Sequence, residues 1–283
     1  MMAAPPVRTK VLLGWFDRDS AIRLLTTERV LPITEAEAEA AWNTYRTRVE
    51  ALPDRPRQLP TEYPLSRFER EHAKAFLRKA RRIERNMDRI IKVDLMDLAV
   101  HQYLVLDEHS DSYAQKIVSG NGWRKHCLEP SPPPRTLQTR QVPPNTIVWE
   151  LPHAEFEPVL VQAPTGSQIG IREFPKWVTV TPCDGRLMLW AGYHRSHARM
   201  KISTPGPDGA AERAVPVVLV SKVEGPLSAD ALTRASGLRP PLLRDFFDER
   251  FFCIEDLRRR RYEIRATFNG TQATVTGVQH IYA

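Results

Sequence analysis

The segment Leu189–Ala198 combines residue types that are suited to hold a phosphate group. It contains the pattern G-x-x-R-x-x-A, formed by Gly192, Arg195 and Ala198, where a strand is expected to end and a helix to begin. The first turn of a helix carries backbone N–H groups without partners and a partial positive charge, and both favour an anion. A glycine lets the backbone approach a phosphate, and a guanidinium that reaches the surface can bind two phosphate oxygens. The segment therefore predicts an anion-binding site.

Further polar residues of the same segment extend this predicted site. His194 and His197 are three residues apart, so a helix would place them side by side on one face. Two histidines without a third ligand make a poor metal site, and we predict no protein-bound metal here. Proton transfer or phosphate contact is one interpretation of His194, which we treat as a candidate catalytic residue, and packing or solvation of both rings is the other. The predicted cofactor-binding residues are Gly192, Tyr193, His194, Arg195, Ser196, His197, Ala198 and Arg213.

Arg213 belongs to this set because of the loop that it ends. The loop Ser203–Ala214 follows the expected helix and is rich in proline and glycine. A loop of this composition beside an anion site is suited to act as a lid, and Arg213 would then bring a second guanidinium to the phosphates. The alternative is a surface connection that does not respond to a ligand.

The order of elements around the segment resembles the ParB/sulfiredoxin-like superfamily. An Asp184-Gly185 hairpin, a strand, the G-x-x-R-x-x-A box with His194 before its arginine, and a Val215-Pro216-Val217 strand follow one another as in that superfamily. The resemblance implies a pocket for a nucleoside triphosphate, ATP or CTP, together with Mg²⁺. It also implies an acid before the box that acts as a base or holds Mg²⁺, and Glu155 is our candidate for this catalytic role.

Two departures from the superfamily narrow what the resemblance implies. Sulfiredoxins carry a reactive cysteine immediately before the His-Arg pair, where this chain has Tyr193, which argues against sulfinic-acid reduction. Partition clamps carry a helix-turn-helix after the pocket, and the sequence after Val223 shows no such pair of helices. An NTPase, a kinase and a nuclease of the ParB-like type stay open, as does a homodimer.

The elements that must position these residues indicate an α+β fold in three parts. We expect a helical N-terminal region at 1–89, a ParB/sulfiredoxin-like module at 90–223, and a C-terminal helix-plus-hairpin extension at 224–283. Capping boxes begin helices at Thr34 and at Ser66. The expected later elements are strands at Val178–Thr181, Arg186–Trp190 and Val215–Val220, a helix at Arg195–Met200, a helix at Ser228–Gly237, and a hairpin of Tyr262–Phe268 with Gln272–Val278 around Asn269-Gly270.

The helix that begins at Ser66 is also the main candidate for contact with DNA or RNA. Its apolar residues recur at helical spacing as far as Ile90, which predicts one long helix. Ten basic and four acidic residues lie between Ser66 and Lys92, and localised positive charge suits a phosphate-bearing partner. The second functional hypothesis is therefore a nucleic-acid-binding protein or nuclease that uses the Arg78–Arg89 helix. A solvated helix face, in a non-catalytic structural or adaptor module, is the third.

Composition limits the class of protein. The chain has 283 residues, 42% of them hydrophobic, and a formal net charge of +7. That composition can build a core and excludes a largely disordered protein. No apolar run is long enough to span a bilayer, and three dispersed cysteines (Cys127, Cys183 and Cys253) do not form a disulfide framework. We expect a cytoplasmic bacterial protein that does not contact a membrane.

Overall fold

The structure is a computed structural model in which two compact units are distinguished. Unit 1 contains Met1–Pro6, Pro130–Pro175 and Leu257–Ala283, and unit 2 contains Val7–Glu129 and Lys176–Asp256. The residues whose structure is described are 7–28, 32–53, 58–80, 87–118, 123, 127–129, 139–142, 146–151, 156–163, 166–173, 176–203, 213–221, 238–248, 250–256, 259–269 and 272–282.

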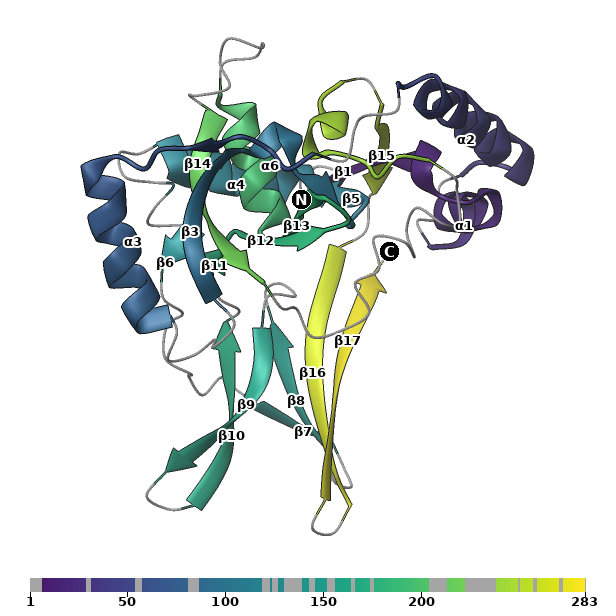
Figure 1. The fold of residues 1–283 in the computed structure, drawn as a ribbon. Coiled ribbons are helices and arrows are strands. Elements are labelled where there is room, and N and C mark those ends of the chain that lie inside the picture. Colours follow the sequence, from purple (N-terminus) through teal and green to yellow (C-terminus); the bar gives the residue numbers. More distant parts are fainter. Residues whose placement is uncertain are drawn as a thin grey trace. The chain divides into compact units, whose positions relative to one another are not determined.

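Unit 2 contains a mixed six-stranded sheet (Figure 1). Its strands are β2 (Glu62–Tyr63), β3 (Met87–Asp94), β4 (Ala99–Val100), β12 (Thr179–Cys183), β13 (Arg186–Ala191) and β14 (Ala214–Val220). Their order in the sheet is β2-β3-β14-β12-β13-β4. The β14–β12 and β13–β4 pairs are parallel, and the other three pairs are antiparallel. The apolar run in β14 is almost wholly buried, as expected for a strand inside a sheet that is covered on both faces.

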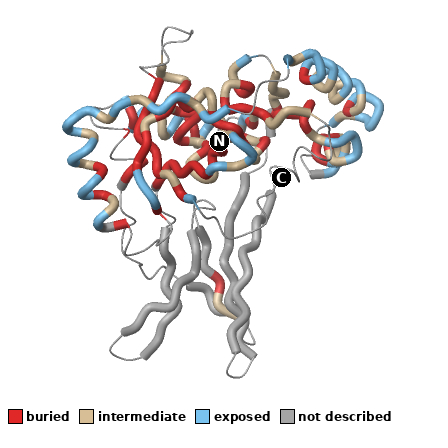
Figure 2. The backbone as a smooth tube through the Cα atoms, in the orientation of Figure 1, coloured by how far each residue is buried: buried red, intermediate tan, exposed pale blue. Residues whose placement is uncertain are grey.

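Helices lie on both faces of this sheet. They are α3 (Arg67–Ala80), α4 (Asp107–Val118) and α6 (Tyr193–Lys201). Val215 and Val217 of β14 belong to the core that contains Ala198 of α6, whereas Val218 packs in a second core with Phe76 of α3. Alternate residues of one strand thus bury themselves against different helices, because successive side chains point to opposite faces. In Figure 2 the strands between these helices are largely buried.

The β12–β13 hairpin forms at the Asp184-Gly185 turn, which confirms the sequence-based prediction. Both turn residues have positive φ, 50° for Asp184 and 70° for Gly185. Two consecutive positive φ values match the right-handed twist of the strands that the turn connects. Cys183 pairs with Arg186 directly across it. This turn leads the chain into β13 and then into the segment with the predicted anion site.

The predicted long helix after Ser66 is wrong in its second half. The capping box is present, since Glu69 N–H donates to Ser66 Oγ (3.2 Å) and Ser66 N–H to the Glu69 carboxylate (2.7 Å). The described helix α3 ends at Ala80, however, and Met87–Asp94 forms strand β3. Antiparallel pairing with β14 and β2 satisfies the backbone of β3, and this tertiary pairing overrides the helical spacing of its apolar residues. Residues 81–86, with three of the arginines of the predicted helix, lie outside the described residues.

A smaller antiparallel sheet and the N-terminal helices complete unit 2. The sheet has the order β15-β1-β5. Thr34 caps α2 as predicted, with its backbone N–H donating to the Glu37 carboxylate (2.7 Å). The elements are β1 (Val7–Val11), β5 (Leu104–Leu106), β15 (Phe252–Asp256), α1 (Arg18–Arg23), α2 (Glu35–Glu50), a π-helical turn η2 (Leu24–Glu28), the 3-10 turns η1 (Leu13–Trp15), η3 (Leu95–Asp97) and η5 (Leu243–Phe246), and the short pair β6 (Leu128–Glu129) with β11 (Lys176–Trp177).

Unit 1 contains a four-stranded antiparallel sheet and a separate two-stranded hairpin. The strands are β7 (Thr139–Val142), β8 (Thr146–Leu151), β16 (Arg259–Asn269) and β17 (Gln272–Tyr282) in the sheet, and β9 (Phe156–Ala163) with β10 (Gly166–Glu173) in the hairpin. The β16–β17 pair confirms the predicted C-terminal hairpin and extends it at both ends. The helix predicted at 228–237 lies outside the described residues.

The chain as a whole is therefore α+β, as predicted, with mixed helices and sheets. The two units do not meet at the predicted boundaries of residues 89 and 223. Strand β1, from the predicted N-terminal region, pairs with β5 of the predicted module and with β15 of the predicted extension. Backbone pairing between segments far apart in sequence places all three in one compact unit.

Candidate functional site

Gly192 sits at the junction of β13 and α6, where the sequence predicted an anion site. Its backbone is left-handed, with φ 93° and ψ 27°, and it is the N-cap of α6. A Cβ atom here would lie 2.8 Å from Val178 Cγ2 and 3.0 Å from Val178 Cα. Glycine is thus required both for the backbone conformation and for close contact with the residue before β12. The close approach that we expected toward a phosphate is made toward Val178.

The first turn of α6 has the electrostatic character of an anion site. No side-chain hydrogen bond from the described residues caps it, and it contains no acidic residue. The helical hydrogen bonds begin when Ser196 N–H donates to Gly192 O (2.8 Å). The backbone N–H groups before Ser196 are those that an α-helix cannot satisfy itself, and they carry the positive end of the helix dipole.

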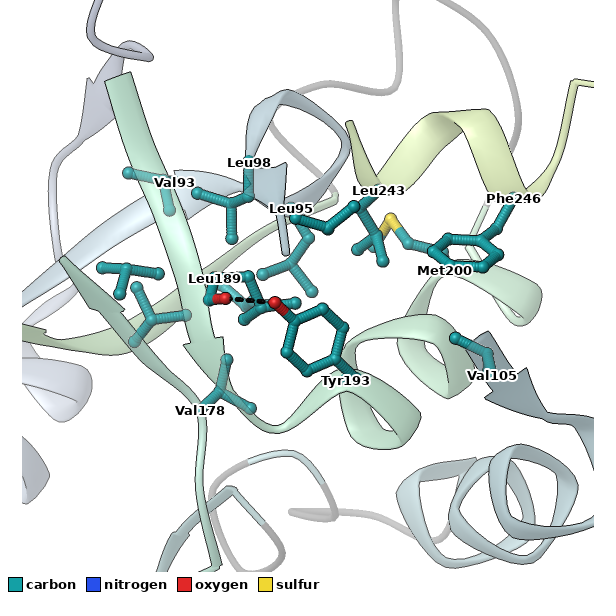
Figure 3. Close-up of a cluster of buried hydrophobic side chains, with 14 of the residues drawn as sticks. Val93, Leu95, Leu98, Val105, Val178, Leu189, Tyr193, Met200, Leu243 and Phe246 are labelled. Atoms are coloured by element: carbon teal, nitrogen blue, oxygen red, sulfur yellow. Dashed lines mark hydrogen bonds between the residues drawn. The ribbon is translucent and has the colours of Figure 1, made fainter. Parts of the chain in front are cut away.

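Tyr193 is a buried positioning residue and not a surface contact for a ligand. Its hydroxyl donates to Leu189 O (2.5 Å), as Figure 3 shows, and accepts from the N–H groups of His101 (3.0 Å) and Gln102 (3.3 Å). Burial raises the pKa of this phenol well above its usual value. The contacts fasten the turn after β4 to the start of α6. The structure thus places His101 and Gln102 beside the first residue of α6.

His194 is half-buried at the second position of α6, between the helix and β5. Its Nε2 atom accepts from Leu106 N–H (3.2 Å), and its ring lies edge-on to that of His109, with 5.1 Å between the centroids. An Nε2 atom that accepts a hydrogen bond carries no proton, so the neutral ring holds its proton on Nδ1. His194 is therefore a hydrogen-bond donor at Nδ1 beside the uncapped turn.

Arg195 is buried, whereas the sequence analysis predicted that its guanidinium reaches the surface. It is only 4% exposed, its guanidinium lies over the Tyr113 ring (5.0 Å to the centroid), and one of its nitrogens is 3.4 Å from the Tyr113 hydroxyl. The third residue of α6 faces α4, and packing of the two helices covers it. Its charge contributes to the potential at the helix start, but it does not form the open clamp that the sequence suggested.

Ser196, His197 and Ala198 are part of the interior and offer no exposed surface to a ligand. His197 Nδ1 is 2.7 Å from Ser110 Oγ, and the ring stacks on Phe247 at 4.5 Å between centroids. Burial lowers the pKa of His197 well below its ordinary value, and the positive charges of Lys10 and Lys201 act in the same direction. Ala198 belongs to the main core of unit 2.

Arg213 forms an internal ion pair and is not the phosphate-binding lid residue that the sequence predicted. It is buried and forms an ion pair with Asp94 at the end of β3, with Nη2 at 2.8 Å and Nε at 3.2 Å from Asp94 Oδ2. The Arg213 guanidinium, which we expected to contact phosphates, therefore binds the Asp94 carboxylate instead. Residues 204–212 of the predicted lid and Glu155, the second candidate catalytic residue, lie outside the described residues.

A pair of aromatic rings borders the same junction. The rings of His101 and Trp190 are 5.1 Å apart between centroids and inclined by 32°, and both residues are half-buried. Trp190 precedes Gly192 by two residues. The Tyr193 hydroxyl contacts both the backbone N–H of His101 and the ring nitrogen Nδ1 of His101, the latter at 2.8 Å. The sequence analysis missed Trp190. Its signal was a large aromatic at the end of a strand that leads into a glycine-initiated helix.

No cluster of three or more His, Cys, Asp or Glu residues in the described part of the chain could hold a metal ion. None of the helices described for this chain combines the length and the apolar character that a bilayer crossing requires.

Comparison of the chain with protein-family models, curated proteins and solved structures gave no match. The ParB/sulfiredoxin-like resemblance therefore stays a prediction, and the site is defined by its own geometry.

Proposed function

We propose that unit 2 binds a nucleoside triphosphate, with its phosphates at the first turn of α6. The observation that carries the proposal is the left-handed Gly192 between β13 and a nine-residue helix whose N-terminus no described side chain caps. Backbone N–H groups and the positive end of the helix dipole are the groups that phosphate oxygens seek at a strand–glycine–helix junction. The resemblance to ParB-like nucleotide-binding modules supports the same position.

Charge around the turn supports an anionic ligand. The first turn has no acidic residue, and Arg195 contributes a fixed positive charge from below the surface. A charge held in a low-dielectric interior acts on a nearby ligand without direct contact. His194 is half-buried in this turn, and we assign its ring a contact with a phosphate oxygen. The proposal thus assigns contact to main chain and His194, and long-range attraction to Arg195.

The aromatic pair supports a ligand that carries a base as well as phosphates. His101 and Trp190 are half-buried beside the same turn and held by Tyr193. A nucleobase that stacks on an aromatic side chain gains roughly 1–3 kcal/mol regardless of its identity. Mg²⁺, when it accompanies the nucleotide, would neutralise phosphate charge. The proposal assigns it no ligand from the described residues.

A thermal-shift panel with ATP, CTP, GTP and UTP, each with and without Mg²⁺, tests the proposal. A ligand at a hundred times its Kd stabilises the folded state by about 2.7 kcal/mol, which corresponds to a rise in Tm on the order of 5 °C. We expect such a rise with at least one nucleotide. No rise with any of the four, up to millimolar concentration, would contradict the proposal.

Two substitutions of His194 localise the ligand. His194→Gln and His194→Glu have nearly the same shape and both lose the ring, but only the glutamate adds a negative charge to the first turn. An acidic residue at a helix N-terminus favours the helix, so His194→Glu should fold while repelling phosphate. We expect its nucleotide affinity to be at least tenfold lower than that of His194→Gln. His72→Glu on α3 is the matched control and should bind nucleotide as the parent does.

A further inference from the structure

The outer face of α3 carries a row of basic side chains. Arg67, Arg70, Lys74 and Arg78, which we call the α3 row, are all exposed. Their spacings of three or four residues place them along one side of the helix. At 1.5 Å per residue the row extends over about 16 Å, which is close to five nucleotide steps of a nucleic-acid strand. Figure 2 shows α3 exposed along the side that faces away from the sheet.

The cations of the α3 row are largely uncommitted within the protein. Among the residues that the structure describes, Lys74 and Arg78 make no ion pair, and Arg70 donates to Leu65 O (2.8 Å). Within the described residues, Arg67 pairs with Glu71 at 3.4 Å, with side chains 90% and 65% exposed. A pair as exposed as this one is screened by water and exchanges readily for another partner. The row is therefore available to an external anion.

The opposite, apolar face of α3 is buried in the core of unit 2. Ala73, Phe76 and Ala80 are buried in a core with residues of β3, β14 and β11, and Phe76 packs edge-on against Trp177 at 5.4 Å between centroids. A helix that binds a membrane surface must bury its apolar face in the lipid. Because α3 has committed that face to the sheet, the surface that it presents is dominated by charge. A charged surface without an apolar face favours a polyanion over a lipid surface as the partner of α3.

One exposed aromatic side chain stands next to this charge. Phe68 is 55% exposed and lies on the same helix between Arg67 and Arg70 in sequence. Basic side chains that track phosphates, together with an aromatic ring on which a base can stack, are the combination that binds single-stranded nucleic acid. The basic sequence also continues with Arg81, Arg82 and Arg85 directly after the described helix.

We propose that the α3 row binds the phosphate backbone of a single-stranded nucleic acid, with Phe68 as a stacking contact. This surface is separate from the nucleotide site on α6 and does not depend on it. Recognition through phosphates and one aromatic ring makes the interaction insensitive to base sequence and strongly dependent on salt.

Fluorescence anisotropy with labelled 20-nucleotide DNA and RNA single strands, from 50 to 200 mM KCl, tests this proposal on the full chain. Lys74→Glu/Arg78→Glu should weaken binding at least tenfold and reduce the slope of log K against log salt by about 1.4, the value for two lost phosphate contacts on a single strand. Arg23→Glu/Arg48→Glu on α1 and α2 changes the net charge equally and should stay within threefold of the parent.

Phe68→Ala should weaken single-strand binding by a further five- to tenfold and leave binding to a duplex of the same length unchanged. Equal losses in the two charge-reversed variants would overturn the proposal, because they would show an effect of net charge alone. A parent protein that binds neither strand at 50 mM KCl, or that binds vesicles with 30% phosphatidylserine in preference to both, would also overturn it. Nucleotide binding at α6 is measured in the same variants and should be unaffected.

Discussion

Helices α3 and α6 are both rich in basic residues, but they place these residues in opposite surroundings. Arg195 of α6 is 4% exposed and lies over Tyr113, whereas Arg78 of α3 is exposed and makes no ion pair among the described residues. Helix α6 packs between α4 and one face of the sheet, and α3 covers the opposite face (Figure 1). The same residue type is thus part of the interior in α6 and an exposed surface charge in α3.

The comparison indicates that substitutions in the two helices should have different consequences. A charged side chain in the interior is held by its neighbours, so its loss alters packing and solvation together. An exposed arginine contributes little to stability and acts through whatever it binds. The following substitutions test whether α6 is a structural element with a ligand-binding end and α3 an interaction surface.

The largest loss of stability is expected at the start of α6. Gly192→Ala forces a side chain into a left-handed backbone and brings its Cβ atom to 2.8 Å from Val178. Strain and overpacking together should lower the free energy of unfolding by about 3 kcal/mol. Urea denaturation followed by circular dichroism measures the loss.

Gly185→Ala in the Asp184-Gly185 turn is the matched control, because its φ is also positive at 70°. It should cost about 1 kcal/mol, the strain of the left-handed conformation alone. Equal losses at the two glycines would show that the close contact with Val178 does not matter.

A loss of intermediate size is expected for Arg195→Ala. The substitution removes a buried side chain and its stacking on Tyr113, and it should lower the free energy of unfolding by about 2 kcal/mol. Arg78→Ala on α3 should change that free energy by less than about 0.5 kcal/mol. Denaturation curves of the two variants, measured side by side, test the contrast. Similar values for both would remove the distinction between the two helices.

The smallest effect is expected from pH. His197 has a pKa well below its ordinary value because it is buried beside other positive groups, so it is neutral in the folded state. Below about pH 6.5 the unfolded chain binds a proton at this residue that the folded chain does not, and stability falls as the pH decreases. The fall should be about 1 kcal/mol between pH 6.5 and pH 5.5.

His197→Gln should flatten this dependence. Urea denaturation at each pH measures the free energy of unfolding and tests whether His197 causes its pH dependence. A dependence that survives unchanged in His197→Gln would assign it to other groups, of which His101, with a pKa also lowered by burial, is the first to test.

The sequence allowed correct prediction of those features that depend on neighbouring residues. Asp184-Gly185 forms its turn and Gly192 begins its helix because their backbone preferences act locally. The capping box of Thr34 is equally local. In the candidate site, the start of the helix at the end of β13 was predicted.

The features that could not be predicted depend on contacts between distant segments. Met87 and Ile90 continue the helical spacing of α3, but pairing with β14, more than 120 residues later, makes them part of a strand. The partner of Arg213 is Asp94, and the burial of Arg195 and His197 results from packing against α4 and η5. Spacing along one helix indicates which residues share a face, and it does not show what covers that face.

Hydrogen–deuterium exchange of the full chain, with and without saturating nucleotide, tests the central claim most directly. The amides in the first turn of α6, Tyr193 to Arg195, should exchange more slowly when phosphates accept their hydrogen bonds, whereas peptides of α3 should be unchanged. Protection by nucleotide that appears in α3 and not in residues 189–198 would contradict the account, as would binding without protection at either helix.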